Sequence, residues 1–258
     1  MLGFFLKKAF FDGWDNLLPL VLVNLAFLPI FSLLFIAGIQ GLPVAVAVLF
    51  LALTWFAVSW WFAVASLVTI RWSDYKSFAF SELPAAMRAA LVPSLQIAGL
   101  LGVVLLALGF GLPFYLSRGL GGALAAGVLF WGSLTGLLGL QFYLPLRFRL
   151  GGGFRKNIRK SFVILFDNPG FSLFVLAWSL LCFVLSAFLA FLAPGFAGLG
   201  LAQHDALKLR LRKYDWLEEV GVKSGDRKRR VPWKELLEEE SELLGKRTLR
   251  GMIFPWKE

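Results

Sequence analysis

The sequence predicts an all-α protein: a polytopic transmembrane helical bundle of about six membrane segments, the last short or broken, with a short helical cytoplasmic tail. First, 59% of its 258 residues are hydrophobic, more than the roughly half that is usual in soluble domains. Second, composition changes abruptly at His204, after which charged residues become frequent. Third, four long stretches contain no Asp, Glu, Lys or Arg: 16–70, 89–117, 119–146 and 168–204.

The uncharged stretches set the expected order of membrane segments. A spanning helix needs about 20 apolar residues, so we expect a membrane domain over 1–203 and a tail over 204–258. The run from Phe171 to Gln203 would reach roughly 50 Å as one helix, too long for a hydrocarbon core of about 30 Å. Pro194 and Gly195 mark a break inside it. The expected segments are 17–37, 44–69, 94–116, 122–144, 171–193 and 195–207.

The distribution of charge predicts the orientation of the chain. Residues 1–203 carry 12 Lys and Arg against 5 Asp and Glu, and these cations cluster in alternate loops. By the positive-inside rule, the N-terminus, the basic loops and the tail lie in the cytoplasm. The alternative is five spans, which would leave the tail outside. Nucleic acid is not an expected partner, because the cations are juxtamembrane and form no continuous stripe.

A weak internal repeat also appears. The segments 6–23 and 158–176 both run from a basic pair through an aromatic stretch and Asp-Asn to a Pro and an apolar span, and 85–101 is a looser third copy. The repeat predicts three hairpins, each led in by an amphipathic interfacial helix. Chance similarity among apolar segments is the alternative interpretation.

Three acidic residues lie where the interfacial helices meet the spans. Asp12, Asp15 and Asp167 are expected to cap the following helices and to complement their dipoles. Their interpretation as ends of a polar pathway lacks a deeper carboxylate to continue it.

Polar and small residues inside the spans predict helix packing. The first five expected spans contain no charged residue, which argues against a proton-driven carrier. Asn24, Gln96 and Gln141 are interpreted as interhelical hydrogen-bond partners, with a pathway for a neutral solute as the alternative. Small residues that favour close helix packing crowd the fourth span, at Gly122, Ala126, Gly132 and Gly136.

Signatures of catalysis and metal binding are missing from the sequence. His204 is the only histidine and Cys182 the only cysteine, so no multi-histidine metal site can form. Clustered carboxylates occur only in the tail, where a solvated helix face is the simpler interpretation. Gly151–Gly153 lacks the context of a phosphate loop and predicts a turn. We therefore expect no catalytic residue, no cofactor and no metal.

The tail contains two segments that are typical of docking surfaces. The segment 232–245 predicts a short amphipathic helix, which cannot be stable without a packing partner. The last nine residues of the tail, "RGMIFPWKE", have the Trp and flanking cations of an interface anchor. Docking on the tail or the membrane surface is one interpretation and recognition of a partner protein is the other. The expected docking residues are Leu236, Leu237, Leu243, Leu244, Ile253, Phe254 and Trp256.

Two parts of the chain resemble a known family. The lead-in "KKAFFDGWDNLL", the first span "LVNLAFLPIFSLL" and the exit "LAPGFAGLGLAQHDALKLRLRKY" are similar to the YesL-like family of bacterial integral membrane proteins of unknown function. The resemblance implies a location in the bacterial cytoplasmic (inner) membrane and an association with carbohydrate uptake systems.

The functional expectation combines these observations. We expect a non-enzymatic accessory or scaffold subunit that contacts the lipid bilayer and, through its tail, a membrane or cytoplasmic protein. The alternative is a small-solute permease, or the membrane component of a transporter, with a pathway along Asn24, Gln96 and Gln141. The sequence predicts no oligomeric state.

Overall fold

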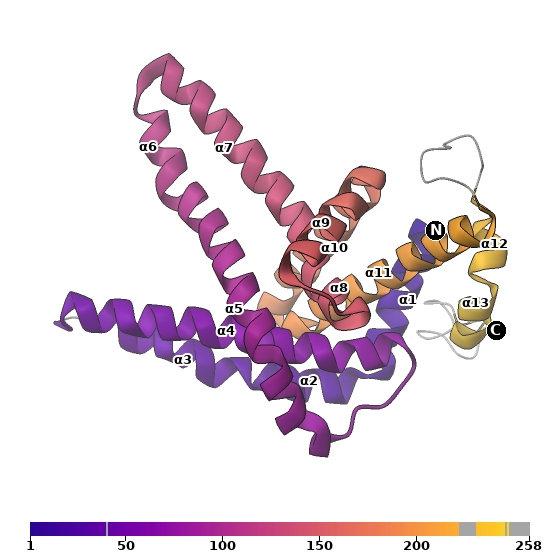
Figure 1. Ribbon diagram of the computed structural model, residues 1–258. Helices are drawn as coiled ribbons and strands as arrows, with labels where there is room; N and C mark the ends of the chain where they lie inside the picture. Colours follow the sequence, from indigo (N-terminus) through magenta and orange to yellow (C-terminus); the bar gives the residue numbers. More distant parts are fainter. Residues whose placement is uncertain (40, 222–230, 246, 248–258) are drawn as a thin grey trace.

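The computed structural model describes residues 1–39, 41–221, 231–245 and 247 of the chain. Within these residues the protein is helical and contains no strand, and five helical runs are long and apolar enough to cross a membrane. The expected all-α membrane bundle is thus confirmed (Figure 1). The five runs are Leu17–Ala37, Val44–Ser73, Phe80–Leu116, Gly119–Leu150 and Pro169–Phe188.

The runs contain breaks that divide them into shorter helices. The α-helices in chain order are α1 (Leu2–Asp15), α2 (Leu17–Leu25), α3 (Phe27–Ala37), α4 (Val44–Ser73), α5 (Leu83–Leu106), α6 (Leu112–Leu116), α7 (Gly119–Leu140), α8 (Tyr143–Leu150), α9 (Phe154–Asp167), α10 (Pro169–Phe188), α11 (Gly195–Glu219), α12 (Trp233–Leu236) and α13 (Glu238–Leu244). A 3-10 turn η1 (Phe80–Glu82) precedes α5, and a π-helical turn η2 (Ala107–Gly111) joins α5 to α6. The π turn lies just before Pro113, whose missing N–H interrupts the α-helical hydrogen-bond pattern.

Three hairpins build the body of the molecule. The α2–α3 run pairs with α4, the α5–α6 run pairs with α7, and α10 pairs with α11. The first two hairpins form arms that spread apart from the centre (Figure 1). The two stronger copies of the sequence repeat, 6–23 and 158–176, begin within α1 and α9 and continue into the membrane helices that follow. Helices α1 and α9 are each 14 residues long.

Helix α11 lies at the centre of the structure and packs against α1, α2, α4, α8 and α10. Residues 195–207, expected as a sixth membrane segment, form its first half, and the helix continues without a break to Glu219. This half is not among the five candidate spans, because its apolar stretch ends at His204. Small residues allow close contact with α4: a Cβ atom added at Gly200 would lie 3.2 Å from Thr69 Oγ1.

A side-chain amide stabilises the break before α11. Asn24 Nδ2 donates to the carbonyls of Leu192 (3.0 Å) and Pro194 (2.9 Å), and Asn24 Oδ1 accepts from the N–H of Ala197 (2.9 Å). The first N–H groups of a helix have no partner inside that helix. Asn24, from α2, therefore caps α11 and joins the first hairpin to the third.

A close approach at Gly195 accompanies this cap. Its N–H donates to Ser186 Oγ at 2.8 Å, and a Cβ atom built on it would lie 2.2 Å from Asn24 Nδ2. Its φ of +57° also favours glycine. The Pro-Gly signal in the sequence thus marks a place where one helix ends and a capped helix begins.

The small residues of α7 have different environments. Gly122 and Ala126 are buried, and a Cβ atom at Gly122 would lie 2.1 Å from the Tyr115 carbonyl oxygen, so this glycine closes the α6–α7 hairpin. A Cβ atom at Gly136 would touch Val104 of α5 at 3.6 Å, whereas one at Gly132 would have no neighbour within 4 Å. Gly132 therefore takes no part in this packing.

We expect Asn24→Ala to lower the free energy of unfolding by about 1–3 kcal/mol, because the N–H and carbonyl groups that it bonds lose their partner in a buried place. Equilibrium unfolding in detergent micelles, followed by tryptophan fluorescence, measures the change. The matched control is Ser32→Ala on α3, whose hydroxyl bonds only the nearby Pro29 carbonyl at an exposed position. Equal stabilities of the two variants would contradict the capping role.

Candidate functional site: a buried charged cluster under the tail

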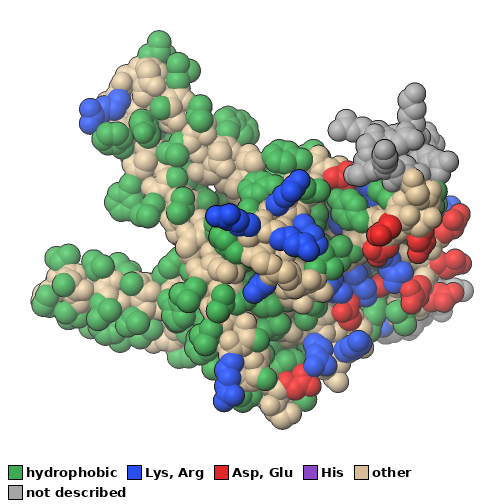
Figure 2. Space-filling model, viewed as in Figure 1, with side chains coloured by type: hydrophobic (Ala, Val, Ile, Leu, Met, Phe, Trp, Pro, Cys, Tyr) green, Lys and Arg blue, Asp and Glu red, His purple; other side chains and the backbone are tan. Residues whose placement is uncertain are grey.

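Charged side chains from distant parts of the sequence meet at one end of the body, beside the tail. We call this set the charged cluster. It joins α1, the end of α4, α8, α11 and α13. Exposed acidic side chains gather on the same side of the molecule as the tail (Figure 2). Its members are Lys8, Asp12, Asp74, Tyr75, Arg149, Asp205, Lys208, Arg212 and Glu240.

The centre of the charged cluster is the Lys8 ammonium group, which is fully buried. Its Nζ atom lies 2.6 Å from Asp12 Oδ2 and 3.0 Å from the Ser73 carbonyl oxygen. It also lies 3.6 Å from a carboxylate oxygen of Asp205 and 3.6 Å from one of Glu240. Burial disfavours the charge, yet the carboxylates of Asp205 and Asp12 hold the pKa of Lys8 above its ordinary value. Lys8 is therefore a cation buried in the protein.

Glu240 connects the tail to the charged cluster. It is 1% exposed, although it lies on a short surface helix. Its carboxylate accepts from Tyr75 O–H at 3.0 Å and pairs with Lys208 at 2.7 Å and Arg212 at 3.1 Å. Burial alone would raise its pKa, but Lys208 and Lys8 hold the pKa of Glu240 below its ordinary value. The ionised carboxylate thus fixes α13 to α11 and to the turn after α4.

Asp12 and Asp205 form a coupled acidic pair beside Lys8. Both are buried, and neither carboxylate oxygen of Asp205 accepts a hydrogen bond from a described residue. Burial and the neighbouring Asp205 raise the pKa of Asp12 to about 8, against the opposing effect of Lys8. Burial also raises the pKa of Asp205. Both shifts favour a proton on the pair, because burial and the proximity of the two carboxylates act against the attraction of Lys8 and Lys208.

The expected caps by acidic residues are wrong. Neither α2 nor α10 has a side-chain capping hydrogen bond at its N-terminus. Asp12 bonds Lys8 instead, and Asp15 lies 2.8 Å from Arg247. Asp167 pairs with Lys213 of α11 at 2.6 Å. Each carboxylate pairs with a cation, which binds it more strongly than a neutral N–H group does.

Asp167 belongs to a second polar contact between α9 and α11. The hydroxyl of Tyr214 donates to it at 3.0 Å, and Arg210 donates to the adjacent Asn168 at 2.8 Å. Burial would raise its pKa, but the hydrogen bonds from Lys213 and Tyr214 hold the pKa of Asp167 below its ordinary value. Central helix α11 is therefore tied by charge to both lead-in helices.

The three intramembrane amides all make hydrogen bonds between helices. Asn24 caps α11, as described above. Gln96 Oε1 accepts from Tyr143 O–H at 2.5 Å, which joins α5 to α8. Gln141 Nε2 donates to the Leu138 carbonyl at 2.8 Å and to the Ser172 carbonyl on α10 at 2.9 Å. The interpretation as packing residues agrees with this geometry.

The expected leucine stripe of the tail does not act as one face. Leu237 and Leu244 are buried, Leu236 is half-buried, and Leu243 is 54% exposed. The expected single helix is broken at Leu237 into α12 and α13, which turns the leucines in different directions. The remaining docking residues, Ile253, Phe254 and Trp256, lie outside the described part of the chain.

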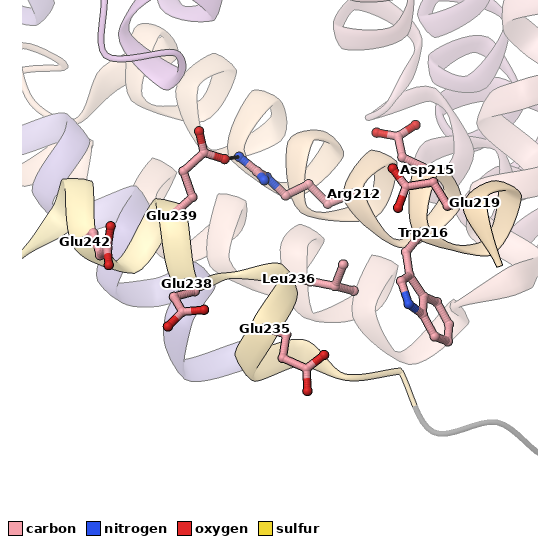
Figure 3. A pocket seen from close by; sticks show the side chains of 9 residues that line it. All are labelled: Arg212, Asp215, Trp216, Glu219, Glu235, Leu236, Glu238, Glu239 and Glu242. Carbon is pink, nitrogen blue, oxygen red and sulfur yellow. Dashed lines mark hydrogen bonds and ion pairs between the residues drawn. The ribbon is translucent and has the colours of Figure 1, made fainter.

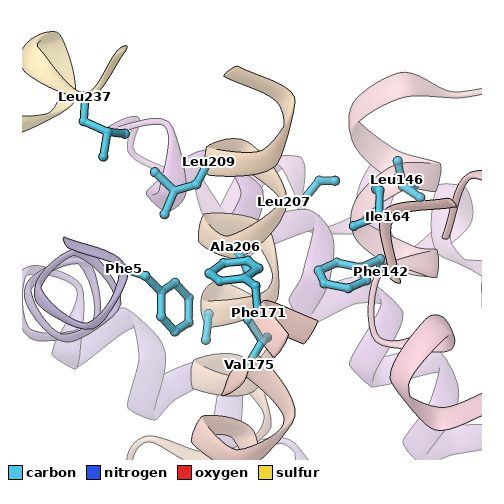
Figure 4. Close-up of a cluster of buried hydrophobic side chains, with 11 residues drawn as sticks. Phe5, Phe142, Leu146, Ile164, Phe171, Val175, Ala206, Leu207, Leu209 and Leu237 are labelled. Atoms are coloured by element: carbon cyan, nitrogen blue, oxygen red, sulfur yellow. The ribbon is translucent and has the colours of Figure 1, made fainter. Parts of the chain in front are cut away.

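An apolar cluster continues from the body into the tail. Leu237 contacts a set of buried side chains around α11, which includes Phe5 of α1 and Phe171 and Val175 of α10 (Figure 4). Arg210 lies over the Phe171 ring at 4.0 Å. The tail is thus held on the body by apolar burial as well as by Glu240.

An acidic groove lies on the outer side of this contact, between the end of α11 and α12–α13. Its volume is about 570 Å³. Trp216 and Leu236 provide an apolar part, while Arg212 pairs with Glu239 at one edge (Figure 3). The other lining residues are all carboxylates: Asp215, Glu219, Glu235, Glu238 and Glu242.

The described residues contain no group of three or more His, Cys, Asp and Glu that could hold a metal ion. His204 is buried in the bundle, where its Nε2 lies 2.9 Å from Ser66 Oγ. Comparison with known proteins finds no family model, no curated protein and no solved structure that matches the chain.

Sequence reasoning missed the charged cluster, because its members are up to 232 positions apart (Lys8 to Glu240). Two local signals could have indicated it. Lys8 and Asp12 are four residues apart within an aromatic helix, and Asp205 and Lys208 follow directly on an apolar segment. Charges in such places are unfavourable unless they are paired.

The charged cluster predicts that stability falls as pH rises from about 4 to about 8. The pKa of Asp12 is raised from 3.8 to about 8, so its contribution is full below about pH 4 and is lost as pH rises through about 8. Asp12→Asn should flatten this dependence, and Asp15→Asn, at an exposed position on the same helix, should not. Unfolding in detergent across this range measures both effects. An unchanged slope in Asp12→Asn would contradict the coupled pair.

Proposed function

We propose that the protein is a non-enzymatic scaffold or accessory subunit in the bacterial cytoplasmic membrane, and that its tail binds a basic, amphipathic segment of a partner protein. The observation that carries this proposal is the fixed acidic groove. Its tail wall is held on the body by the buried Glu240 and Leu237, and six carboxylates line the groove beside Trp216 and Leu236.

Charge supports this choice of partner. The chain has a formal net charge of +10, yet the described residues that line the groove include six acidic side chains and one cation, Arg212. An acidic surface is repelled by anionic lipid headgroups and attracts basic segments. A partner helix with Lys or Arg on one side and apolar residues on the other would match both parts of the groove.

The proposed orientation of the protein in the membrane follows from its basic residues. Lys8, Arg149 and Lys208 lie together at the end of the body that holds the tail, while Arg118 lies in the turn between α6 and α7 at the far tip of an arm. By the positive-inside rule, the end with the tail faces the cytoplasm. The resemblance to the YesL-like family adds carbohydrate uptake as the kind of system that the scaffold serves.

The polar groups of the spans favour a scaffold over a permease. Asn24, Gln96 and Gln141 each bond a neighbouring helix, so their replacement should disturb packing before it alters any pathway. These amides form interhelical hydrogen bonds that stabilise the bundle, which suits a scaffold.

Site-specific photocrosslinking in cells tests the proposal. A photoreactive amino acid replaces Glu238 in the groove. In a second variant the photoreactive amino acid replaces the exposed Leu173 of α10 and reports contacts of the membrane body. We expect a discrete crosslinked protein from position 238, with a basic segment at the point of attachment. This product should be lost in Glu219→Lys, which reverses a charge in the groove.

The matched control is Glu218→Lys, an equal change of charge at the adjacent exposed residue, which does not line the groove. The crosslink should survive in this variant. The proposal is wrong if position 238 yields no crosslinked protein, or if Glu218→Lys and Glu219→Lys reduce the product equally. Saturable solute uptake by the purified protein alone in liposomes would also contradict a scaffold role.

A further inference from the structure

A cavity of about 310 Å³ lies between α4, α5, α10 and α11, away from the tail. A second cavity of about 150 Å³ adjoins it and shares the lining residues Phe62, Ile97, Leu101 and Gln203. The larger volume is at the lower end of the range for small-molecule sites. Such sites are mostly apolar and aromatic, with a few placed polar groups.

The lining of the larger cavity is mostly apolar and aromatic, as in such sites. The larger cavity is enclosed mainly by rings and aliphatic side chains, which include Trp55, Phe62, Phe183 and Phe196. None of the residues that line either cavity is charged. A charged ligand would therefore be buried without a counter-ion, which is strongly unfavourable. The cavity selects a neutral ligand.

Two buried polar atoms in the lining lack a described partner. They are Ser179 Oγ in the larger cavity and Gln141 Oε1 in the smaller one, and the residues are 8% and 7% exposed. A helical serine commonly bonds the carbonyl four residues before it, as Ser172 and Ser186 do in the same helix. Ser179 makes no such bond.

The cavity opens toward the surface that contacts lipid. Leu180 and Phe183, on the outer side of α10, line the cavity and are 58% and 42% exposed. This helix is one of the five candidate membrane spans. A ligand can therefore enter from the hydrocarbon region without crossing water.

We propose that this cavity binds a neutral, membrane-dissolved lipid alcohol, with its hydrocarbon chain among the aromatic side chains. A hydroxyl both donates and accepts, so it satisfies Ser179 Oγ and the amide groups of Gln203 or Gln141. Phospholipid acyl chains fit the apolar lining but leave these polar atoms without a partner, since their ester groups remain near the membrane interface. The site is separate from the acidic groove and does not depend on the scaffold role.

Photolabelling of the full-length protein in lipid nanodiscs tests the site. The probe is hexadecanol with a diazirine in the chain and a terminal alkyne, and the comparison probes are the matching carboxylic acid and the matching hydrocarbon. We expect saturable labelling of peptides from α10 and α11 by the alcohol, about fivefold above the hydrocarbon, which is the effect of one net hydrogen bond. Unlabelled hexadecanol should compete.

Ser179→Ala removes the hydroxyl at nearly unchanged volume, so labelling by the alcohol should fall to the level of the hydrocarbon. Ser133→Ala, at another buried serine that lines neither cavity, is the matched control. A second pair keeps the test valid if Ser179→Ala misfolds: Leu180→Trp at the opening should reduce labelling, and the adjacent Leu181→Trp should not. Equal labelling by alcohol and hydrocarbon, preference for the acid, or unchanged labelling in both Ser179→Ala and Leu180→Trp would overturn the proposal.

Discussion

The burial of Lys8 is the constraint on which much of this structure depends. An ammonium group removed from water must be paired, and unpaired burial costs several kcal/mol or more. Lys8 has no exposure and lies near carboxylates from its own helix, from α11 and from α13. Its compensation therefore requires the lead-in helix, the central helix and the tail to be assembled together.

Central helix α11 makes this assembly possible in a membrane body. Its small residues permit contact with α4, and Asn24 and Ser186 supply hydrogen bonds that a helix beginning inside the bundle needs. Its second half carries Asp205, Lys208 and Arg212 to the charged cluster. One helix thus links the apolar interior to the tail surface.

The sequence predicted those features that depend on local pattern. Uncharged runs located the five candidate spans, and Pro194 with Gly195 marked the break before α11. Gly151 and Gly152 predicted a turn, and their φ values of +64° and +88° explain why glycine is needed there. These signals are contained in short segments, so one sequence suffices to interpret them.

Features that depend on distant pairing could not be predicted in the same way. The capping roles of Asp12, Asp15 and Asp167 were wrong, because cations remote in sequence were stronger partners than the nearby N–H groups. The leucine pattern of the tail suggested one face, but the break at Leu237 separates the leucines. Among the cavity residues, Gln141 was singled out in the sequence as a polar residue within a span, whereas Ser179 and the apolar lining residues carry no local signal of a site.

A double-mutant cycle between Lys8 and Asp205 tests the central claim most directly. Lys8→Met, Asp205→Asn and the double variant would be compared by free energy of unfolding in detergent. If Lys8 and Asp205 compensate each other within the charged cluster, the double variant should be less destabilised than the sum of the single variants by more than about 1 kcal/mol. Additivity within about 0.5 kcal/mol would show that the two groups act independently and would contradict the account.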